Sequence, residues 1–124
     1  MIFTFGSNLA GRHGAGAAKY AMTARGAKYG VGVGRTGECY ALPTKDKAIR
    51  TMSLEAIKEH VDRFIDYAER NSNCDFQVTR IGCGLAGLKD SDIAPMFNNA
   101  PSNCYFDEKW MPYLGDQHNY WGSF

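Results

Sequence analysis

The chain has 124 residues, 44% of them hydrophobic, and a formal net charge of +1. This length predicts one domain with one core, and the composition is typical of a globular protein and excludes disorder. The balance of 14 basic and 13 acidic residues excludes a strongly basic nucleic-acid binder and an acidic tail protein. No apolar run is long enough to span a membrane, so we expect no membrane partner.

The first six residues lack the basic and long apolar regions of a signal peptide. The 4 cysteines form no Cys-x-x-Cys pair, and the 3 histidines are scattered, so no zinc-finger spacing exists. We therefore expect free thiols and a cytoplasmic protein.

The first predicted unit is a strand, a glycine loop and a helix. The β-rich run 2–5 stops at the turn cluster 6–8, and a glycine loop follows over 11–16. The alanine-rich segment 17–22 predicts a helix, with Gly26 as its C-terminal stop.

The middle of the chain predicts a turning segment, a strand and a long helix. Segment 29–37 holds four glycines and turns sharply, the strand 39–42 ends at Pro43, and a polar loop spans 44–47. Ser53 can cap an amphipathic helix, whose apolar residues recur at three- and four-residue steps. These apolar residues are Leu54, Ile57, Val61, Phe64, Ile65 and Ala68.

The last part predicts a strand over 76–81, a glycine loop over 82–87, a short helix capped by Ser91 and a strand over 103–106. The domain is assigned to 1–110, and 111–124 is a tail. Because exposed aromatic surface is costly, we expect the aromatic residues near this end to pack or to meet a partner. They are Trp110, Tyr113, Tyr120, Trp121 and Phe124.

Alternating strands and helices predict an α/β fold with a mostly parallel sheet and helices on both faces. The loops 6–16, 43–47 and 82–89 leave the carboxyl ends of strands, where open α/β sheets bind ligands. Two of these loops are glycine-rich and lead into helices, so their backbone N–H groups suit phosphate. Two such loops at one crevice suit a diphosphate.

The two glycine loops differ in how specific they are. Gly11-x-x-Gly14-x-Gly16 is equally compatible with a plain tight turn, and it is neither a dinucleotide-binding fingerprint nor a P-loop. Three glycines between 82 and 87, directly after a buried strand, indicate a backbone that another group approaches closely.

Five side chains on these loops have a functional and a plain interpretation. Lys45, Asp46 and Asp90 are catalytic candidates, although most loop charges are only solvated. Cys83 is a nucleophile or, since no histidine lies nearby in sequence, a small packing residue. His13 touches phosphate or, as position alone favours, is merely exposed.

Several segments match a known pattern in order and spacing over roughly residues 2 to 106. They are Ser7-Asn8-Leu9 with Gly11, Gly14 to Ala17, Tyr40 to Lys45 and Thr79 to Leu88, with Arg-Ile-Gly-Cys-Gly-Leu the most specific stretch. Together they resemble the macro domain, the ADP-ribose-binding module. The closest resemblance is to the branch of terminal ADP-ribose protein glycohydrolase and the DNA ADP-ribosyl glycohydrolase antitoxins, in the form of small stand-alone bacterial and phage proteins.

The resemblance implies a three-layer α/β/α sandwich that binds an ADP-ribose-like nucleotide, free or on an ADP-ribosylated macromolecule. In that branch, the lysine matching Lys45 attacks the anomeric carbon of the distal ribose. The first loop lines this ribose and the second wraps the diphosphate, which needs no metal or other cofactor. The implied ligand-binding residues are Gly6, Ser7, Asn8, Leu9, Gly11, His13, Gly14, Ala15, Gly16, Thr44, Gly82, Cys83, Gly84, Leu85, Ala86 and Gly87.

The chain departs from the family pattern at two points. Ala86 stands where the branch has an aspartate that helps release the product, which leaves Asp90 and Asp46 as candidate acids. The chain also begins at the strand with the asparagine, without the preceding strand and Gly-Asp element that contacts adenine. Adenine would then be recognised elsewhere, with the aromatic tail as one candidate, or the ligand differs from plain ADP-ribose.

Three functions remain open. Lys45 favours an ADP-ribosyl hydrolase that acts on a modified macromolecule or a small derivative. Ala86 favours a non-catalytic binder that senses or sequesters an NAD-derived signal nucleotide, as in phage counter-defence. A protein-interaction domain built on the aromatic tail is the third, and the retained glycine loops argue against it.

Overall fold

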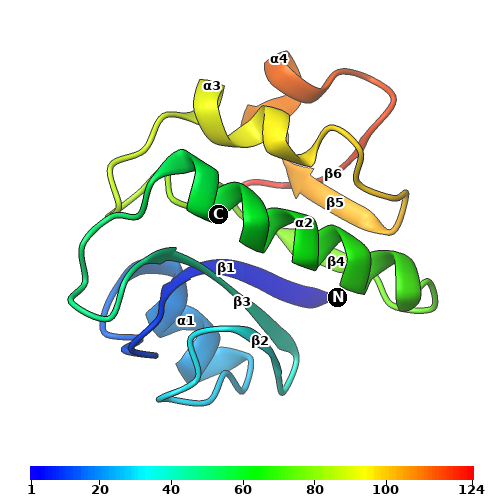
Figure 1. Cartoon of the computed structure of the whole chain (residues 1–124). Coiled ribbons are helices and arrows are strands. Elements are labelled where there is room, and N and C mark those ends of the chain that lie inside the picture. The colour runs from blue at the N-terminus through cyan, green and yellow to red at the C-terminus, as the bar shows by residue number, and fades with distance from the viewer.

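The computed structural model describes residues 1–124 and shows an α/β fold built on one six-stranded sheet (Figure 1). The strands are β1 (Ile2–Asn8), β2 (Gly34–Thr36), β3 (Cys39–Lys45), β4 (Phe76–Val78), β5 (Cys104–Asp107) and β6 (Asn119–Gly122). The helices are α1 (Gly16–Ala24), α2 (Leu54–Arg70), α3 (Asp90–Ile93) and α4 (Met111–Leu114), with 3₁₀ turns η1 (Ala94–Phe97) and η2 (Glu108–Trp110).

The strand order is β2-β3-β1-β4-β5-β6. All neighbouring strands are parallel except β2 and β3, which are antiparallel. The predicted α/β class with a mostly parallel sheet is therefore confirmed. No helix combines the length and the apolar character that crossing a membrane requires.

Alternate residues of the central strands β1 and β3 belong to two separate apolar cores. Phe3 and Phe5 pack in one core with Ala18 and Ala21 of α1. The other core is larger and contains Leu42 of β3 and the buried stripe of α2. Buried residues of β4, β5, η1, η2 and α4 complete it. Because side chains alternate across a strand, these two cores lie on opposite faces, and helices cover both (Figure 1).

Helix α2 forms as the periodicity predicts. The first N–H groups of the helix have no hydrogen-bond acceptors within it. The Ser53 hydroxyl accepts a hydrogen bond from one of them, Ala56 N, at 3.2 Å. The expected stripe is buried apart from Leu54, the first residue of the helix, which is 40% exposed.

The first two predicted strand ends are wrong. β1 does not stop at the turn cluster but continues to Asn8, and β3 continues past Pro43 to Lys45, since the two strands pair along this length. The antiparallel ladder of β2 ends opposite Ala41, so Pro43 lies where β3 has a single neighbouring strand. This position is compatible with proline's missing N–H.

Three further predictions are corrected. The segment expected only to turn contains β2, and β4 ends at Val78 rather than at residue 81. Ser91 does not cap α3, because the helix begins at Asp90, with Lys89 as its N-cap residue and no side-chain cap.

The residues after β5 return to the sheet. Trp110 is fully buried, and β6 pairs in parallel with β5. The Trp121 indole donates to Val78 O at 2.9 Å, and the Phe124 ring packs against Tyr20 of α1. The C-terminal segment thereby links the β6 edge of the sheet to α1.

Candidate functional site

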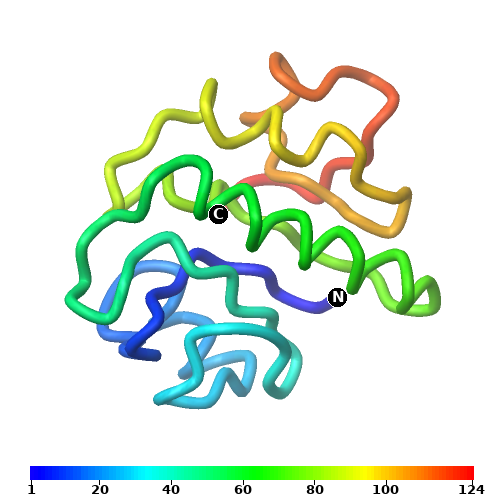
Figure 2. The backbone as a smooth tube through the Cα atoms, viewed as in Figure 1, coloured from blue at the N-terminus to red at the C-terminus, as the bar shows by residue number.

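A cavity of about 570 Å³ lies at the carboxyl ends of β1, β3 and β4. The three loops that leave these strands gather on one side of the molecule, at the left of Figure 2. The cavity is lined by one catalytic candidate, Lys45. Of the predicted ligand-binding residues it is lined by Gly6, Ser7, Asn8, Gly14, Ala15, Gly16, Thr44, Gly82, Cys83, Gly84, Leu85 and Ala86.

Six predicted site residues do not line this cavity: Leu9, Gly11, His13, Asp46, Gly87 and Asp90. Nine other residues line it that sequence reasoning did not select as site residues, namely Arg12, Ala17, Ala18, Ile49, Thr79, Arg80, Ile81, Asp107 and Phe124. Arg12 lies inside the glycine loop and could have been chosen. Asp107 and Phe124 come from the last part of the chain, where no local signal connects them to the loops.

The first loop is held in shape by the Asn8 amide. Asn8 Nδ2 donates to Arg12 O at 2.8 Å, and Arg12 N donates to Asn8 Oδ1 at 3.0 Å. Both ends of the amide are therefore used to fold the loop. Gly11 adopts a φ of 70°, and a Cβ there would lie 2.2 Å from the Gly30 carbonyl carbon, so this position requires glycine.

His13 is fully buried, so its expected exposure is wrong. Its ring packs edge-on against Phe5 with centroids 5.3 Å apart, and Nε2 lies 3.1 Å from Val31 O. These neighbours come from β1 and from the segment before β2. His13 thus joins the first loop to that segment.

Two separate runs of backbone N–H groups at the cavity have no acceptor in the protein. One run is the first turn of α1, residues 16–18, which no side chain caps. The other is the second glycine loop at residues 84–86. The two cationic side chains Arg12 and Lys45 also line the cavity and form no ion pair. This arrangement favours an anion with more than one charged group.

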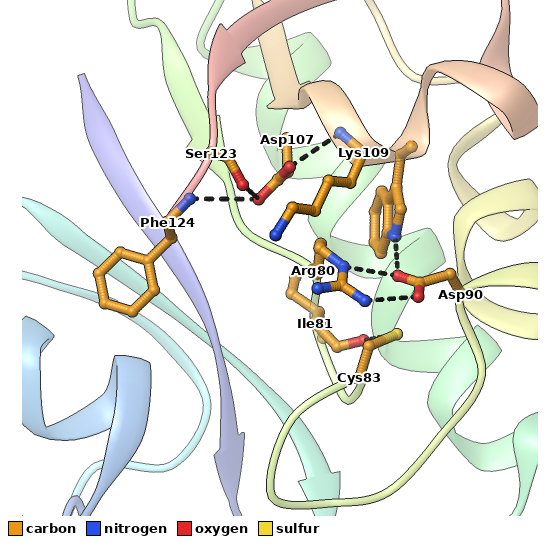
Figure 3. Close-up of polar contacts among 9 residues, drawn as sticks. Arg80, Ile81, Cys83, Asp90, Asp107, Lys109, Ser123 and Phe124 are labelled. Carbon is orange, nitrogen blue, oxygen red and sulfur yellow. Dashed lines mark hydrogen bonds and ion pairs between the residues drawn. The ribbon is translucent and has the colours of Figure 1, made fainter.

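Asp90 is paired with Arg80 at the start of the second glycine loop (Figure 3). Arg80 Nε and Nη2 donate to its two oxygens at 2.8 and 2.6 Å, and Trp110 Nε1 donates to Oδ1 at 2.6 Å. The hydrogen bonds from Arg80 are the main cause that lowers the pKa of Asp90 to about 2. Asp90 is therefore a charged anchor between this loop and η2.

Asp46 folds the turn in which it lies. Its carboxylate accepts Ala48 N at 2.9 Å and Arg50 N at 3.0 Å. The hydrogen bond from the Arg50 backbone is the main cause that lowers the pKa of Asp46. Asp46 and Asp90, the two carboxylates predicted from the sequence as candidate acids, thus both accept hydrogen bonds that stabilise the fold.

The Cys83 thiol lies close to the Arg80–Asp90 pair (Figure 3). Burial is the largest cause that raises its pKa to about 12, and the negative charge of Asp90 adds to it. A thiol with this pKa is protonated at neutral pH and is a poor nucleophile. These surroundings support the packing interpretation of Cys83.

Asp107 supplies the carboxylate that does line the cavity. It is 1% exposed and stands at the end of β5. Lys109 N donates to Oδ1 at 2.9 Å, while Ser123 Oγ and Phe124 N donate to Oδ2 at 3.0 and 3.3 Å (Figure 3). Asp107 therefore holds the C-terminal segment at the cavity, and with it the Phe124 ring.

The chain matches no protein-family model, and no curated protein or solved structure is significantly similar to it.

Proposed function

We propose that the protein is a macro-domain-like α/β/α sandwich whose cavity binds ADP-ribose or a nucleotide derived from it. The observation that carries this proposal is the pair of N–H runs at residues 16–18 and 84–86, which come from two glycine loops and line one cavity without protein acceptors. Two such runs suit the two phosphates of a diphosphate.

The other residues that line the cavity support a nucleotide rather than a bare phosphate. A volume of about 570 Å³ lies within the range of small-molecule sites. Arg12 and Lys45 supply positive charge beside the N–H groups. Phe124 offers an aromatic face to a base, and Asp107 offers carboxylate oxygens to hydroxyl or amino groups.

We propose binding without turnover as the primary activity, because three positions argue against an acid catalyst. Ala86 replaces the family's aspartate, Asp46 is tied into its own turn, and Asp90 is paired with Arg80. In this role the protein senses or sequesters an NAD-derived signal nucleotide. The cytoplasmic location expected from the sequence is consistent with four free cysteines.

The second candidate function is removal of ADP-ribose from a modified macromolecule, and the position of Lys45 favours it. Its side chain lines the cavity and has no hydrogen bond or ion pair in the protein. Attack by neutral Lys45 Nζ on the anomeric carbon would form a C–N bond and break the bond to the leaving group, which takes up the proton that the amine loses. Water must then break the C–N bond, which releases ADP-ribose and restores the lysine. Asp107 is the only carboxylate that lines the cavity, and as a base it could take up the proton of the attacking water.

Calorimetric titration with ADP-ribose tests the binding proposal. We expect micromolar affinity, about −8 kcal/mol, and a loss of at least roughly tenfold in Lys45→Ala. Lys47→Ala is the matched control, since Lys47 is an exposed lysine two residues away that does not line the cavity. The absence of heat at millimolar ADP-ribose, with correctly folded protein, would contradict the proposal.

Turnover is tested on an ADP-ribosylated peptide by mass spectrometry, with wild type, Lys45→Ala and Asp107→Asn. We expect the wild-type protein to bind the peptide and leave it modified. Release of free ADP-ribose that is abolished in Lys45→Ala would instead establish the hydrolase.

A further inference from the structure

Ile49 is the only non-glycine residue in the chain with a positive φ, at 62°. A β-branched side chain is strongly disfavoured in this left-handed region, because its Cβ crowds the following carbonyl oxygen. Glycine, asparagine and aspartate are the residues that ordinarily occupy such positions. The fold of the turn alone therefore does not explain an isoleucine.

The turn around Ile49 is fixed from several directions. Ile49 N donates to Asp46 O at 3.0 Å, and Asp46 N donates to Arg50 O at 2.8 Å. The Asp46 carboxylate accepts two further backbone N–H groups, as described above. These bonds hold the strained residue in one conformation.

The same turn is joined to the second glycine loop. Thr51 pairs with Lys45 in an isolated bridge, and Thr51 Oγ1 donates to Ala86 O at 3.1 Å. Ile49 lines the cavity, and its side chain is 36% exposed. On the neighbouring loop Leu85 also lines the cavity and is 72% exposed.

An exposed apolar side chain gains no free energy by contacting a phosphate group. The backbone N–H groups and the cationic side chains at the cavity already suit phosphate. An apolar side chain gains free energy by covering the apolar surface of a sugar or a base. We propose that Ile49 is a specificity-determining residue that contacts the nucleoside part of the ligand and so discriminates a nucleotide from a bare diphosphate. This inference rests on the proposed nucleotide binding.

The test compares Ile49→Gly and Ile49→Asn with wild type, using ADP-ribose and inorganic diphosphate as separate calorimetric ligands. Both replacements tolerate a positive φ, so we expect an unchanged or higher unfolding temperature. We expect ADP-ribose affinity to fall about tenfold and diphosphate affinity to stay within about twofold. Leu54→Ala is the control, because Leu54 is 40% exposed and does not line the cavity.

The outcomes separate this inference from the proposed function. Unchanged ADP-ribose affinity in both variants overturns the role of Ile49 and leaves nucleotide binding intact. An equal loss for both ligands also overturns it, because Ile49 would then act through the shape of the turn. Wild-type protein that binds diphosphate but not ADP-ribose refutes the proposed nucleotide binding and the role of Ile49 together.

Discussion

Gly82 and Gly84 lie two residues apart in the second glycine loop, and alanine should affect them in opposite ways. Gly82 has a φ of 78°, and a Cβ there would lie 2.8 Å from Leu88 Cδ1. Gly84 has no left-handed φ, and a Cβ there would meet nothing within 4 Å. Gly82 is therefore required by the fold, whereas Gly84 keeps open the cavity that it lines.

The size of each effect follows from general conformational and packing energies applied to these two positions. A left-handed alanine costs about 1–2 kcal/mol, and moving the Leu88 side chain adds up to about 1 kcal/mol. For Gly82→Ala we expect a loss of about 2 kcal/mol, which corresponds to a fall of roughly 8 °C in Tm for a chain of this size. Gly84→Ala should instead gain about 0.5 kcal/mol, because alanine restricts the unfolded chain.

Thermal unfolding and ADP-ribose titration of both variants check this reasoning. We expect Gly84→Ala to keep or raise Tm while binding ADP-ribose at least roughly tenfold more weakly, since its methyl group occupies the cavity. A fall in Tm as large as that of Gly82→Ala would refute the assigned loop conformation. Unchanged affinity in Gly84→Ala would show that the ligand does not approach this backbone.

Two further predictions concern the Arg80–Asp90 pair and its neighbouring thiol. The pKa of Asp90 is lowered from 3.8 to about 2, so its contribution to stability is present above pH 4 and is lost as the pH falls through about 2. Asp90→Asn should therefore cost about 2 kcal/mol in urea unfolding at pH 7 and progressively less toward pH 2, and a pH-independent difference would contradict this. Cys83 should resist iodoacetamide at pH 8 in the folded protein and react in urea, because its pKa is raised to about 12. Mass mapping of the alkylated cysteines checks this, and rapid labelling of folded Cys83 would contradict it.

Elements whose signals are local could be predicted from the sequence. α2 carries its cap at Ser53 and a buried stripe at three- and four-residue steps, so its position needs no information from the rest of the chain. The two glycine loops were found for the same reason. In contrast, β2 is three residues long within a glycine-rich segment, and β6 becomes a strand by pairing with β5.

The site was harder to predict, because its residues depend on contacts between distant segments. Asp90 looks like a free loop carboxylate until Arg80 and Trp110 are placed beside it. The burial of His13 depends on the segment before β2. Asp46 is the exception, since an aspartate whose side chain bonds the N–H two residues later is a recognised turn signal that could have been read.

The central position of β1 has a consequence for how the chain folds. β1 precedes both of its neighbours in the sequence, since β3 and β4 begin at residues 39 and 76. The middle of the sheet is therefore completed only after most of the chain has left the ribosome, and contacts of this sequence separation form slowly. β3 can pair with Phe3 and Phe5 once residues 39–45 are available, whereas the other edge of β1 stays unpaired until β4 is made. An unpaired strand edge of this kind is prone to aggregation during that interval.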